Sequence, residues 1–247
     1  MEEIQNRITT GLRVNGPKDD AATFAIAQNM RGDIAGMNAL KTTLGLGQST
    51  VNVAIDAGKA ISNLLTEMKA KSVQASQAGM GSDSYSALQN EFRALRAQLT
   101  TIAETAEFNG KNLITAGATD LQVLSIIEGS TITVAAQSLD PTTLLIHTAT
   151  LATANSASQA RVLIDSAITT VANSLASLGS AAKRVDIQAT FTSKLMDIVK
   201  QGVGNLVDAV SAEESANLQV IQIKQQLGVQ ALAIANGSPQ SILALFQ

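Results

Sequence analysis

The sequence predicts a mainly α protein, an elongated antiparallel helical rod or bundle with one small β-hairpin. Three observations lead to this fold class. Apolar residues recur at the seven-residue a/d spacing over a long C-terminal stretch, and two earlier stretches repeat a helical apolar pattern. The chain is 45% hydrophobic but only 2% aromatic. Such a core must consist mainly of Ala, Leu, Ile and Val packed between helices.

Charge and cysteine content exclude several classes of function. The net charge is −3 and no run of Lys and Arg occurs, so the sequence predicts no nucleic acid partner and no anionic membrane surface. The chain has no Cys and therefore no disulfide or thiolate metal site. No uninterrupted apolar stretch is long enough to cross a bilayer, which predicts no membrane insertion. Met1–Ile4 does not read as a Sec-type signal.

The N-terminal residues indicate the end of one helix, a loop and the start of another. Met1–Thr10 has a helical pattern that Gly11 ends. The loop 11–18 contains an Asn-Gly turn signal and a proline. Asp19 or Asp20 is expected to cap the next helix, because a carboxylate accepts hydrogen bonds from free N–H groups at a helix N-terminus.

Two helices joined by a short turn should follow. The first runs from Ala21 to about Ser76, and a glycine-containing turn, 77–82, leads to a second helix capped by Ser82 or Asp83. A short turn implies that the two helices are antiparallel. On the first helix, one face should carry the apolar residues Ile26, Met30, Met37, Leu40, Leu44, Val51 and Ile55. The heptad of the second helix contains Tyr85, Leu88, Phe92, Leu95, Leu99, Ile102 and Ala106.

After the second helix, the spacing of the apolar residues changes from a helical to an alternating pattern. In residues 121–128 and 131–134 the side chains alternate between two faces on either side of a Gly-Ser turn, which predicts the β-hairpin. Residues 140–155 form a Thr- and Ala-rich connector without a clear structural pattern. From about Ser156 a long helix carries the main seam, Ile164–Val210, roughly 70 Å long at about 1.5 Å per residue. The two preceding helices should cover this seam within the same chain. The seam residues expected in the core are Ile164, Ile168, Val171, Leu175, Leu178, Val185 and Met196.

Beyond Val210 the seam is broken at Glu213 and Asn217, and a helix with two apolar faces follows. A helix that is apolar on two faces must be buried on both, which favours cover by neighbouring copies of the chain. The residues expected at this interface are Leu218, Val220, Ile221, Ile223, Leu227, Val229, Leu232 and Ile234, with Leu243 and Phe246 in the tail.

Residues able to perform catalysis are sparse. His147, the single histidine, lies in the connector, where a solvated side chain is expected. Ser180–Lys183 matches a four-residue SxxK pattern but lacks the companion motifs of acyl-serine enzymes. We therefore expect no enzyme activity, and no catalytic, cofactor-binding or metal-binding residues.

Several short motifs in the sequence resemble those of bacterial flagellin, most of all its alphaproteobacterial type. Ile8–Ala22 (ITTGLRVNGPKDDAA) is similar to the family's spoke loop between two helices, and Phe108–Gly110 to its hairpin entry. Leu218–Phe246, with Gln226–Asn236 (QLGVQALAIAN) inside it, resembles the C-terminal helix and tail. The spoke residues implicated in polymerisation by this resemblance are Gly11, Arg13, Asn15, Lys18, Asp19 and Asp20.

The resemblance implies a secreted subunit that self-assembles into the flagellar filament for motility. Its implied partners are other flagellin subunits, an export chaperone, the filament cap and the hook-junction proteins, with export by the type III apparatus. The terminal helices would form a coiled-coil inner core. The implied division is 1–19 for the end of the N-terminal inner-core helix and the spoke loop, 20–120 for outer-core helices, 121–155 for hairpin and connector, 156–210 for the C-terminal outer-core helix, and 211–247 for the C-terminal inner-core helix and tail.

Two departures from the family and two alternatives remain open. Flagellins normally have roughly thirty further residues before the point where this chain begins, and large variable outer domains; here 121–155 predicts a smooth, thin filament surface. The first alternative function is a hook–filament junction protein of the flagellin type. The second is a coiled-coil signalling or binding rod, which would explain the heptads but not the spoke loop.

Overall fold

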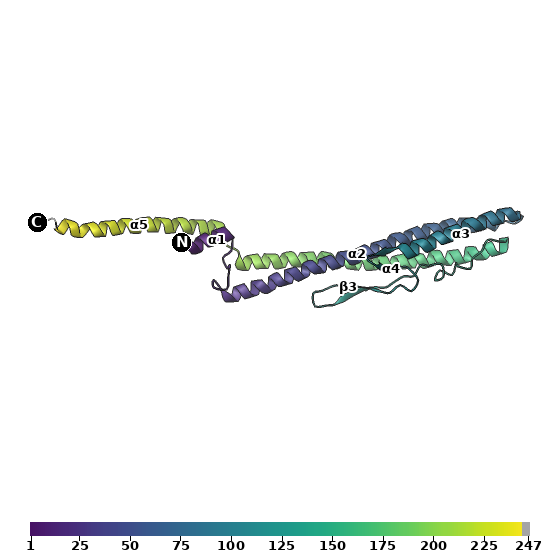
Figure 1. Ribbon diagram of the computed structural model, residues 1–247, viewed down its shortest axis with the longest axis horizontal. Helices are drawn as coiled ribbons and strands as arrows, with labels where there is room; N and C mark the ends of the chain where they lie inside the picture. The colour runs from purple at the N-terminus through teal and green to yellow at the C-terminus, as the bar shows by residue number, and fades with distance from the viewer. Residues whose placement is uncertain (244–247) are drawn as a thin grey trace. The chain divides into compact units, whose positions relative to one another are not determined.

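The computed structural model describes the backbone of residues 1–243 and the side chains of residues 1–234. The described part is mainly helical, which confirms the predicted fold class (Figure 1). Its elements are α1 (Glu2–Thr10), α2 (Ala21–Ala75), α3 (Ser82–Thr105), β1 (Glu107–Phe108), β2 (Lys111–Asn112), β3 (Leu121–Leu124), β4 (Thr131–Val134), α4 (Ala154–Val207) and α5 (Ser211–Leu243).

The chain divides into two compact units. The bundle unit is Gly36–Lys194, and the terminal unit consists of Met1–Ala35 and Leu195–Gln247. The long helices α2 and α4 contribute residues to both units. Each unit has its own buried apolar cluster.

In the bundle unit, α2 and α3 cover the seam of α4, as the heptads predict (Figure 1). Helix α2 is also tied to α4 by an ion pair between Lys69 Nζ and Asp165 Oδ1 at 2.6 Å. The sole tyrosine, Tyr85, donates a hydrogen bond from its hydroxyl to the carbonyl of Gln77 across the α2–α3 turn at 3.2 Å. Fully or almost fully buried seam residues include Leu88, Phe92, Leu99, Ile164, Val171, Leu178 and Val185.

Some predicted seam residues lie at the margin of the core. Leu95, Ile168 and Leu175 are half-buried against the cluster, and Met196 is buried on α4 within the terminal unit. The assignment of Ile26 to the shared face of the first helix is wrong, because this side chain is 53% exposed. A long helix accumulates a phase error against a fixed apolar repeat, so its faces drift along its length.

Three glycines of α2 lie eleven residues apart and form one line on the helix, since eleven residues complete about three turns. A Cβ atom at Gly36 would lie 3.2 Å from Ile127, one at Gly47 would lie 2.6 Å from Val123, and one at Gly58 would lie 2.8 Å from Leu175. These glycines therefore allow the hairpin and α4 to approach the backbone of α2 closely.

The hairpin of β3 and β4 has the predicted antiparallel pairing, with Leu121 opposite Val134 and Leu124 opposite Thr131. The prediction of one hairpin is nevertheless incomplete, because β1 and β2 form a second short antiparallel pair. Asn109 and Gly110 join these strands with φ angles of 52° and 73°. Asn-Gly is the residue pair that tolerates two positive φ angles in a tight hairpin turn.

The connector after β4 is more ordered than its composition indicates. Leu139, Ile146 and Leu151 are fully buried in the bundle core. Asp140 accepts hydrogen bonds from the N–H groups of Thr142 and Thr143 and from the Thr143 hydroxyl. Partial burial raises the pKa of Asp140, but these hydrogen bonds outweigh it, and the net pKa lies below its ordinary value.

Helix ends differ in part from the sequence expectation. Gly81, not Ser82 or Asp83, precedes α3 as its N-cap, and no side chain caps that helix. Thr153 and Ser156 exchange hydrogen bonds at the start of α4, each backbone N–H donating to the other's hydroxyl, which is the logic of a capping box. Helix α4 ends at Val207, so the predicted continuous seam to Val210 is three residues too long.

By length and composition alone, α4 could cross a membrane, since one 18-residue window of it has a mean hydropathy of 1.3. Ser and Thr are interspersed along α4, which is why a search for uninterrupted apolar residues does not find a span in it. The core helix of a bundle passes the same test, and the seam of α4 is buried against α2 and α3.

Asp20 caps α2, as one of the two expected alternatives. Its Oδ1 accepts the N–H groups of Ala22 and Thr23, each at 3.0 Å, and its Oδ2 accepts the Thr23 hydroxyl at 2.6 Å. The hydrogen bonds from Thr23 are the main reason why the pKa of Asp20 lies below its ordinary value of 3.8.

Replacing Gly47 by Ala should destabilise the protein by about 1–3 kcal/mol, because the new methyl group would overlap Val123, a β-branched strand residue with few alternative rotamers. The matched variant Gly45→Ala should instead stabilise it by about 0.5–1 kcal/mol, because Gly45 is exposed in the same helix and its Cβ would meet nothing within 4 Å. Chemical denaturation of both variants measures the difference. Equal effects would show that the hairpin does not constrain Gly47.

The Asp20 cap should make stability depend on acidic pH. A carboxylate with a lowered pKa stabilises the folded state above its unfolded pKa, and this contribution is lost as the pH falls through the folded pKa. Asp20→Ala should therefore be less stable than the wild type at pH 7, and the difference should shrink below the ordinary pKa of 3.8. Asp20→Asn keeps an acceptor oxygen and should retain most of the cap without this pH dependence. Denaturation midpoints across the acidic range provide the measurement.

Candidate assembly surface

The loop between α1 and α2 is held to the end of α4 by main-chain hydrogen bonds within the terminal unit. Gly11 ends α1 in the left-handed conformation, with a φ of 69°. The N–H groups of Arg13 and Val14 both donate to the carbonyl of Val207, at 2.7 and 3.2 Å, and the N–H of Ala209 donates to the carbonyl of Gly11 at 2.8 Å. These bonds satisfy groups that the ends of two helices would otherwise leave unpaired.

Side chains of the predicted spoke residues reinforce the loop. Arg13 Nη2 donates to the carbonyl of Leu206 at 2.6 Å. Asp19 Oδ2 accepts the N–H groups of Asn15 and Gly16 at 2.9 and 3.0 Å, which closes the loop on itself. The side chains of Asn15 and Lys18 are exposed and are available to other molecules. Thus Gly11, Arg13, Asp19 and Asp20 shape this loop in a single copy.

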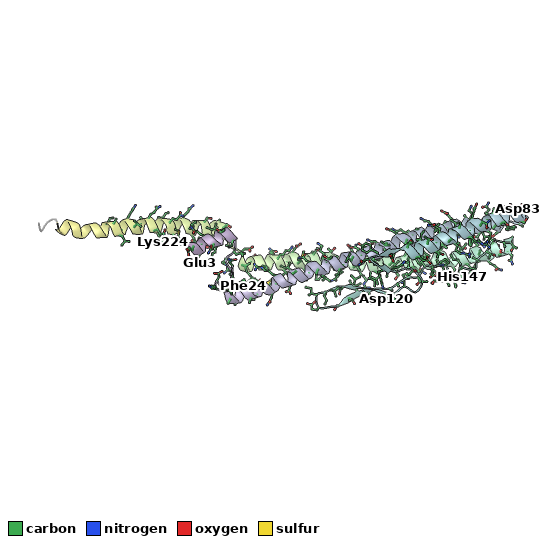
Figure 2. The ribbon with its side chains drawn as sticks, in the orientation of Figure 1. Glu3, Phe24, Asp83, Asp120, His147 and Lys224 are labelled. Atoms are coloured by element: carbon green, nitrogen blue, oxygen red, sulfur yellow. The ribbon has the colours of Figure 1, made fainter. Side chains whose placement is uncertain are left out.

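A small apolar cluster lies under the loop. Val14 from the loop, Ala27 from α2, and Val203 and Val207 from α4 are buried together, with Phe24 packed against them. The Phe24 label in Figure 2 marks this position. The sequence did not single out Val14, although an apolar residue between Arg13 and Asn15 is the signal that could have identified it.

Helices α1 and α5 pack against each other in the terminal unit. Arg7 joins them, because its Nη2 contacts Glu3 Oε1 at 2.7 Å on α1 and its Nη1 contacts Glu214 Oε1 at 3.2 Å on α5. Glu214 is only 8% exposed. A carboxylate this buried needs its cationic partner, so Arg7 and Glu214 link α1 to the first turn of α5. Sequence analysis missed both residues.

Past this contact, most apolar residues of α5 up to Ile234, where the described side chains end, are in water. Leu218 and Ile221 are half-buried. Leu243 belongs to the helix, but its side chain is not described, and Phe246 lies outside the described residues. The predicted interface residues exposed by 47% to 76% are Val220, Ile223, Leu227, Val229, Leu232 and Ile234.

The remaining surface of α5 is polar but almost uncharged. After Glu214, Lys224 is the single charged residue of the helix, and Figure 2 labels it. Gln222 and Gln226 lie one helical turn apart and share a face. A helix with this surface has little charge to keep identical copies apart, while its apolar residues favour association.

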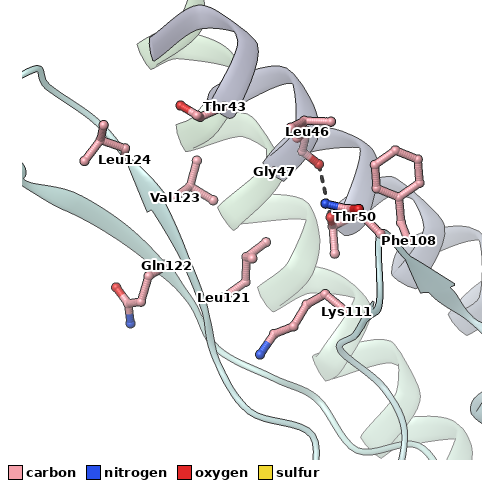
Figure 3. A pocket seen from close by; sticks show the side chains of 11 residues that line it. Thr43, Leu46, Gly47, Thr50, Phe108, Lys111, Leu121, Gln122, Val123 and Leu124 are labelled. Atoms are coloured by element: carbon pink, nitrogen blue, oxygen red, sulfur yellow. Dashed lines mark hydrogen bonds between the residues drawn. The ribbon is translucent and has the colours of Figure 1, made fainter. Parts of the chain in front are cut away.

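The other surface features provide little for catalysis. Among the described residues no group of three or more His, Asp and Glu side chains is arranged to hold a metal ion. Figure 3 shows an open hollow of about 240 Å³ between α2 and the hairpins. Lys111 is the one ionisable side chain that lines it, so no acid–base or nucleophile–base pair is present there. His147 is exposed in the connector.

Comparison with protein-family models matches two parts of the chain. Residues 1–119 match the bacterial flagellin N-terminal helical region, and residues 161–246 match the bacterial flagellin C-terminal helical region. The two matches together span most of the chain and include the loop, α1 and α5.

Curated relatives match over the whole chain. Flagellin FljM of Caulobacter vibrioides is 44% identical over 248 residues, which are all of this chain and 91% of the relative. A flagellin of Brucella melitensis biotype 1 is 36% identical over 261 residues, covering all of this chain and 92% of the relative. Flagellin C of Rhizobium meliloti is 32% identical and is covered to 92%.

Solved structures share the fold at low sequence identity. The crystal structure of Bacillus cereus flagellin has a TM-score of 0.56 at 23% identity, over 61% of this chain and 88% of that one. A putative flagellar hook-associated protein from Vibrio parahaemolyticus has a TM-score of 0.65 at 12% identity, over 77% of this chain and all of the other. With two flagellin regions matched and relatives aligned over its full length, this chain belongs to the bacterial flagellin family.

Proposed function

We propose that copies of this chain join one another through the exposed apolar residues of α5. As a flagellin, the chain is a structural subunit of the flagellar filament, which is an extracellular polymer. The observation that carries the proposal is the exposure of six large apolar side chains on α5 in a helix that is almost uncharged. Burial of these side chains between copies drives assembly.

The magnitude of this driving force is substantial. Full burial of a Val, Leu or Ile side chain contributes about 1.5–3 kcal/mol relative to full exposure. Several such side chains on each copy can therefore offset the loss of translational and rotational freedom, which is of order 4–15 kcal/mol per association event. A single copy cannot cover these residues, so the ordering of α5 and the assembly of copies are coupled.

The loop 11–18 and the Arg7–Glu214 ion pair hold the helices that carry the proposed assembly surface. Main-chain bonds join Gly11–Val14 to the end of α4, and the ion pair joins α1 to α5. Both chain ends thus contribute to one assembly surface. In this proposal residues 1–19 and 211–247 form the inner core of the filament, and 20–210 form its outer part.

The path of the chain to its site of assembly is also a proposal. The absence of Cys and the helical, mostly local contacts of the chain suit unfolding, passage through the flagellar type III apparatus and rapid refolding. An export chaperone, the filament cap and the hook-junction proteins are the partners that family membership suggests. Exposed α5 residues are the natural site for a chaperone before assembly.

The alternative functions receive less support. The relatives aligned over the whole chain are flagellins, whereas the likeness to a hook-associated protein is one of fold at 12% identity. A filament subunit is therefore favoured over a hook–filament junction protein. A signalling rod would leave the two flagellin regions unexplained.

The double variant Ile223→Ser/Leu227→Ser should raise the critical concentration for filament growth by roughly tenfold or more, because two apolar side chains would no longer be buried between copies. Sedimentation of filaments grown from seeds of the wild-type chain measures this concentration. The free energy of unfolding of the bundle unit should not change, and chemical denaturation can verify this.

The matched control is Gln222→Ser/Gln226→Ser, two polar residues of the same helical turns. This variant should assemble within a few-fold of the wild type. If the serine variants of both pairs assembled equally well, apolar contacts of α5 would not be what joins neighbouring copies.

A further inference from the structure

Asparagine followed by glycine is prone to lose its side-chain amide, and the chain contains three such pairs, Asn15–Gly16, Asn109–Gly110 and Asn236–Gly237. The backbone nitrogen of the glycine loses its proton and forms a bond to the side-chain Cγ of the asparagine. The amide nitrogen leaves as ammonia, and water opens the resulting succinimide ring to aspartate or isoaspartate. Glycine favours this reaction because no Cβ shields its nitrogen. The first two pairs lie where the structure describes side chains.

The Asn109–Gly110 pair is protected by the shape of its turn. The two residues have φ angles of 52° and 73° and join the paired strands β1 and β2, as in a type I′ hairpin turn. The first residue of such a turn has a ψ of about 30°. At this angle the Gly110 nitrogen lies nearly opposite the Cβ of Asn109 across the Cα–C bond. The succinimide ring therefore cannot close unless the hairpin opens.

The Asn15–Gly16 pair has no such turn. Asn15 does not have a positive φ, and its side chain is exposed in the loop 11–18. Here the nitrogen is held by a side chain, because the Gly16 N–H donates a hydrogen bond to Asp19 Oδ2 at 3.0 Å. The N–H of Asn15 donates to the same oxygen at 2.9 Å. One carboxylate oxygen thus fixes the backbone on both sides of the Asn15 Cα.

This hydrogen bond opposes both requirements of the reaction. The Gly16 nitrogen must turn towards the side chain of Asn15, and a bond to a charged acceptor is one of the stronger ones to break. The nitrogen must also lose its proton, and the negative charge of Asp19 beside it disfavours a second negative charge there. A carboxylate is far too weak a base to remove an amide proton itself, so Asp19 does not assist the reaction.

We propose that Asn15 is a site of deamidation and that Asp19 protects it in the folded chain. The site becomes reactive when the contact between Gly16 and Asp19 opens, above all in the unfolded chain. The reaction takes place within one copy, so this inference is independent of how copies assemble.

Deamidation of Asn15 would also remove the contact that protects it. An aspartate at position 15 adds a third carboxylate to a segment that already has Asp19 and Asp20, and like charges repel. In isoaspartate the main chain runs through the former side chain and is one carbon longer. Either product moves the N–H groups away from Asp19. Because the amide is lost as ammonia, refolding does not restore the original loop.

The test compares the full-length wild type with Asp19→Ala, both folded and held at mildly alkaline pH. Peptide mapping by mass spectrometry follows the conversion of Asn15, and chromatography separates the aspartate and isoaspartate products. Asp19→Ala should raise the rate of conversion at Asn15 by roughly tenfold or more, because a hydrogen bond to a charged group no longer has to be broken.

The matched control is Asp20→Ala, which removes the adjacent carboxylate. Asp20 bonds to Ala22 and Thr23 rather than to Gly16, so its loss should leave the rate at Asn15 close to that of the wild type. Asn109 provides an internal reference in each sample and should convert slowly in all three folded chains.

Three results would overturn the inference. Equal rates at Asn15 in the wild type and Asp19→Ala would show that the contact gives no protection. A slower rate in Asp19→Ala would show that the carboxylate promotes the reaction. An equal acceleration in Asp20→Ala would trace the effect to lower stability of the start of α2, and not to the Gly16 contact. Chemical denaturation establishes that each variant is folded.

A second measurement needs the wild type alone and remains decisive if Asp19→Ala does not fold. The rate at Asn15 in the folded chain should be lower by roughly tenfold or more than in the same chain unfolded in guanidinium chloride. The Gly16 N–H should also exchange slowly with solvent in the folded chain. Equal conversion rates in the two states, or fast exchange of this N–H, would contradict the protection of Asn15.

Discussion

The main-chain pairing between Gly11–Val14 and Val207–Ala209 is the constraint on which the terminal unit depends. Two helices end here, at Thr10 and Val207, and their free carbonyl and N–H groups would be costly if they remained unpaired away from water. The short ladder satisfies them mutually and buries Val14 beneath it. Without it, α1 and α5 would have only the Arg7–Glu214 ion pair and their side-chain packing to hold them together.

The helical architecture could be predicted because it depends on periodicity, which a sequence displays directly. The heptads through Phe92 and Val171 identify which faces meet, and both side chains are fully buried. The β3–β4 hairpin was predictable for the same reason, from alternation around a Gly-Ser turn. Asp20 was one of two candidate caps, and the choice between adjacent aspartates depends on backbone geometry that no local pattern records.

Other features depend on contacts between distant residues and were not predictable. Leu139 and Leu151 sit in a stretch rich in Thr and Ala, and their burial follows from where the connector lies on the bundle. Glu214 stands next to Glu213, a predicted break in the apolar seam, and nothing local marks it out, because its partner Arg7 is 207 residues away in the chain. Gly47 resembles Gly45 in sequence, and only the approach of Val123 distinguishes them. Assembly surfaces are the hardest features to predict, because their partner is another molecule.

The position of Tyr85 has a practical consequence for spectroscopy. The protein contains no Trp and one Tyr, and that tyrosine bonds to Gln77 across the α2–α3 turn. Its tyrosine absorption and emission therefore come from a single location, the turn between α2 and α3. Intrinsic emission reports opening or covering of that turn without an added label, and it is blind to events at α5, where an introduced fluorophore would be needed.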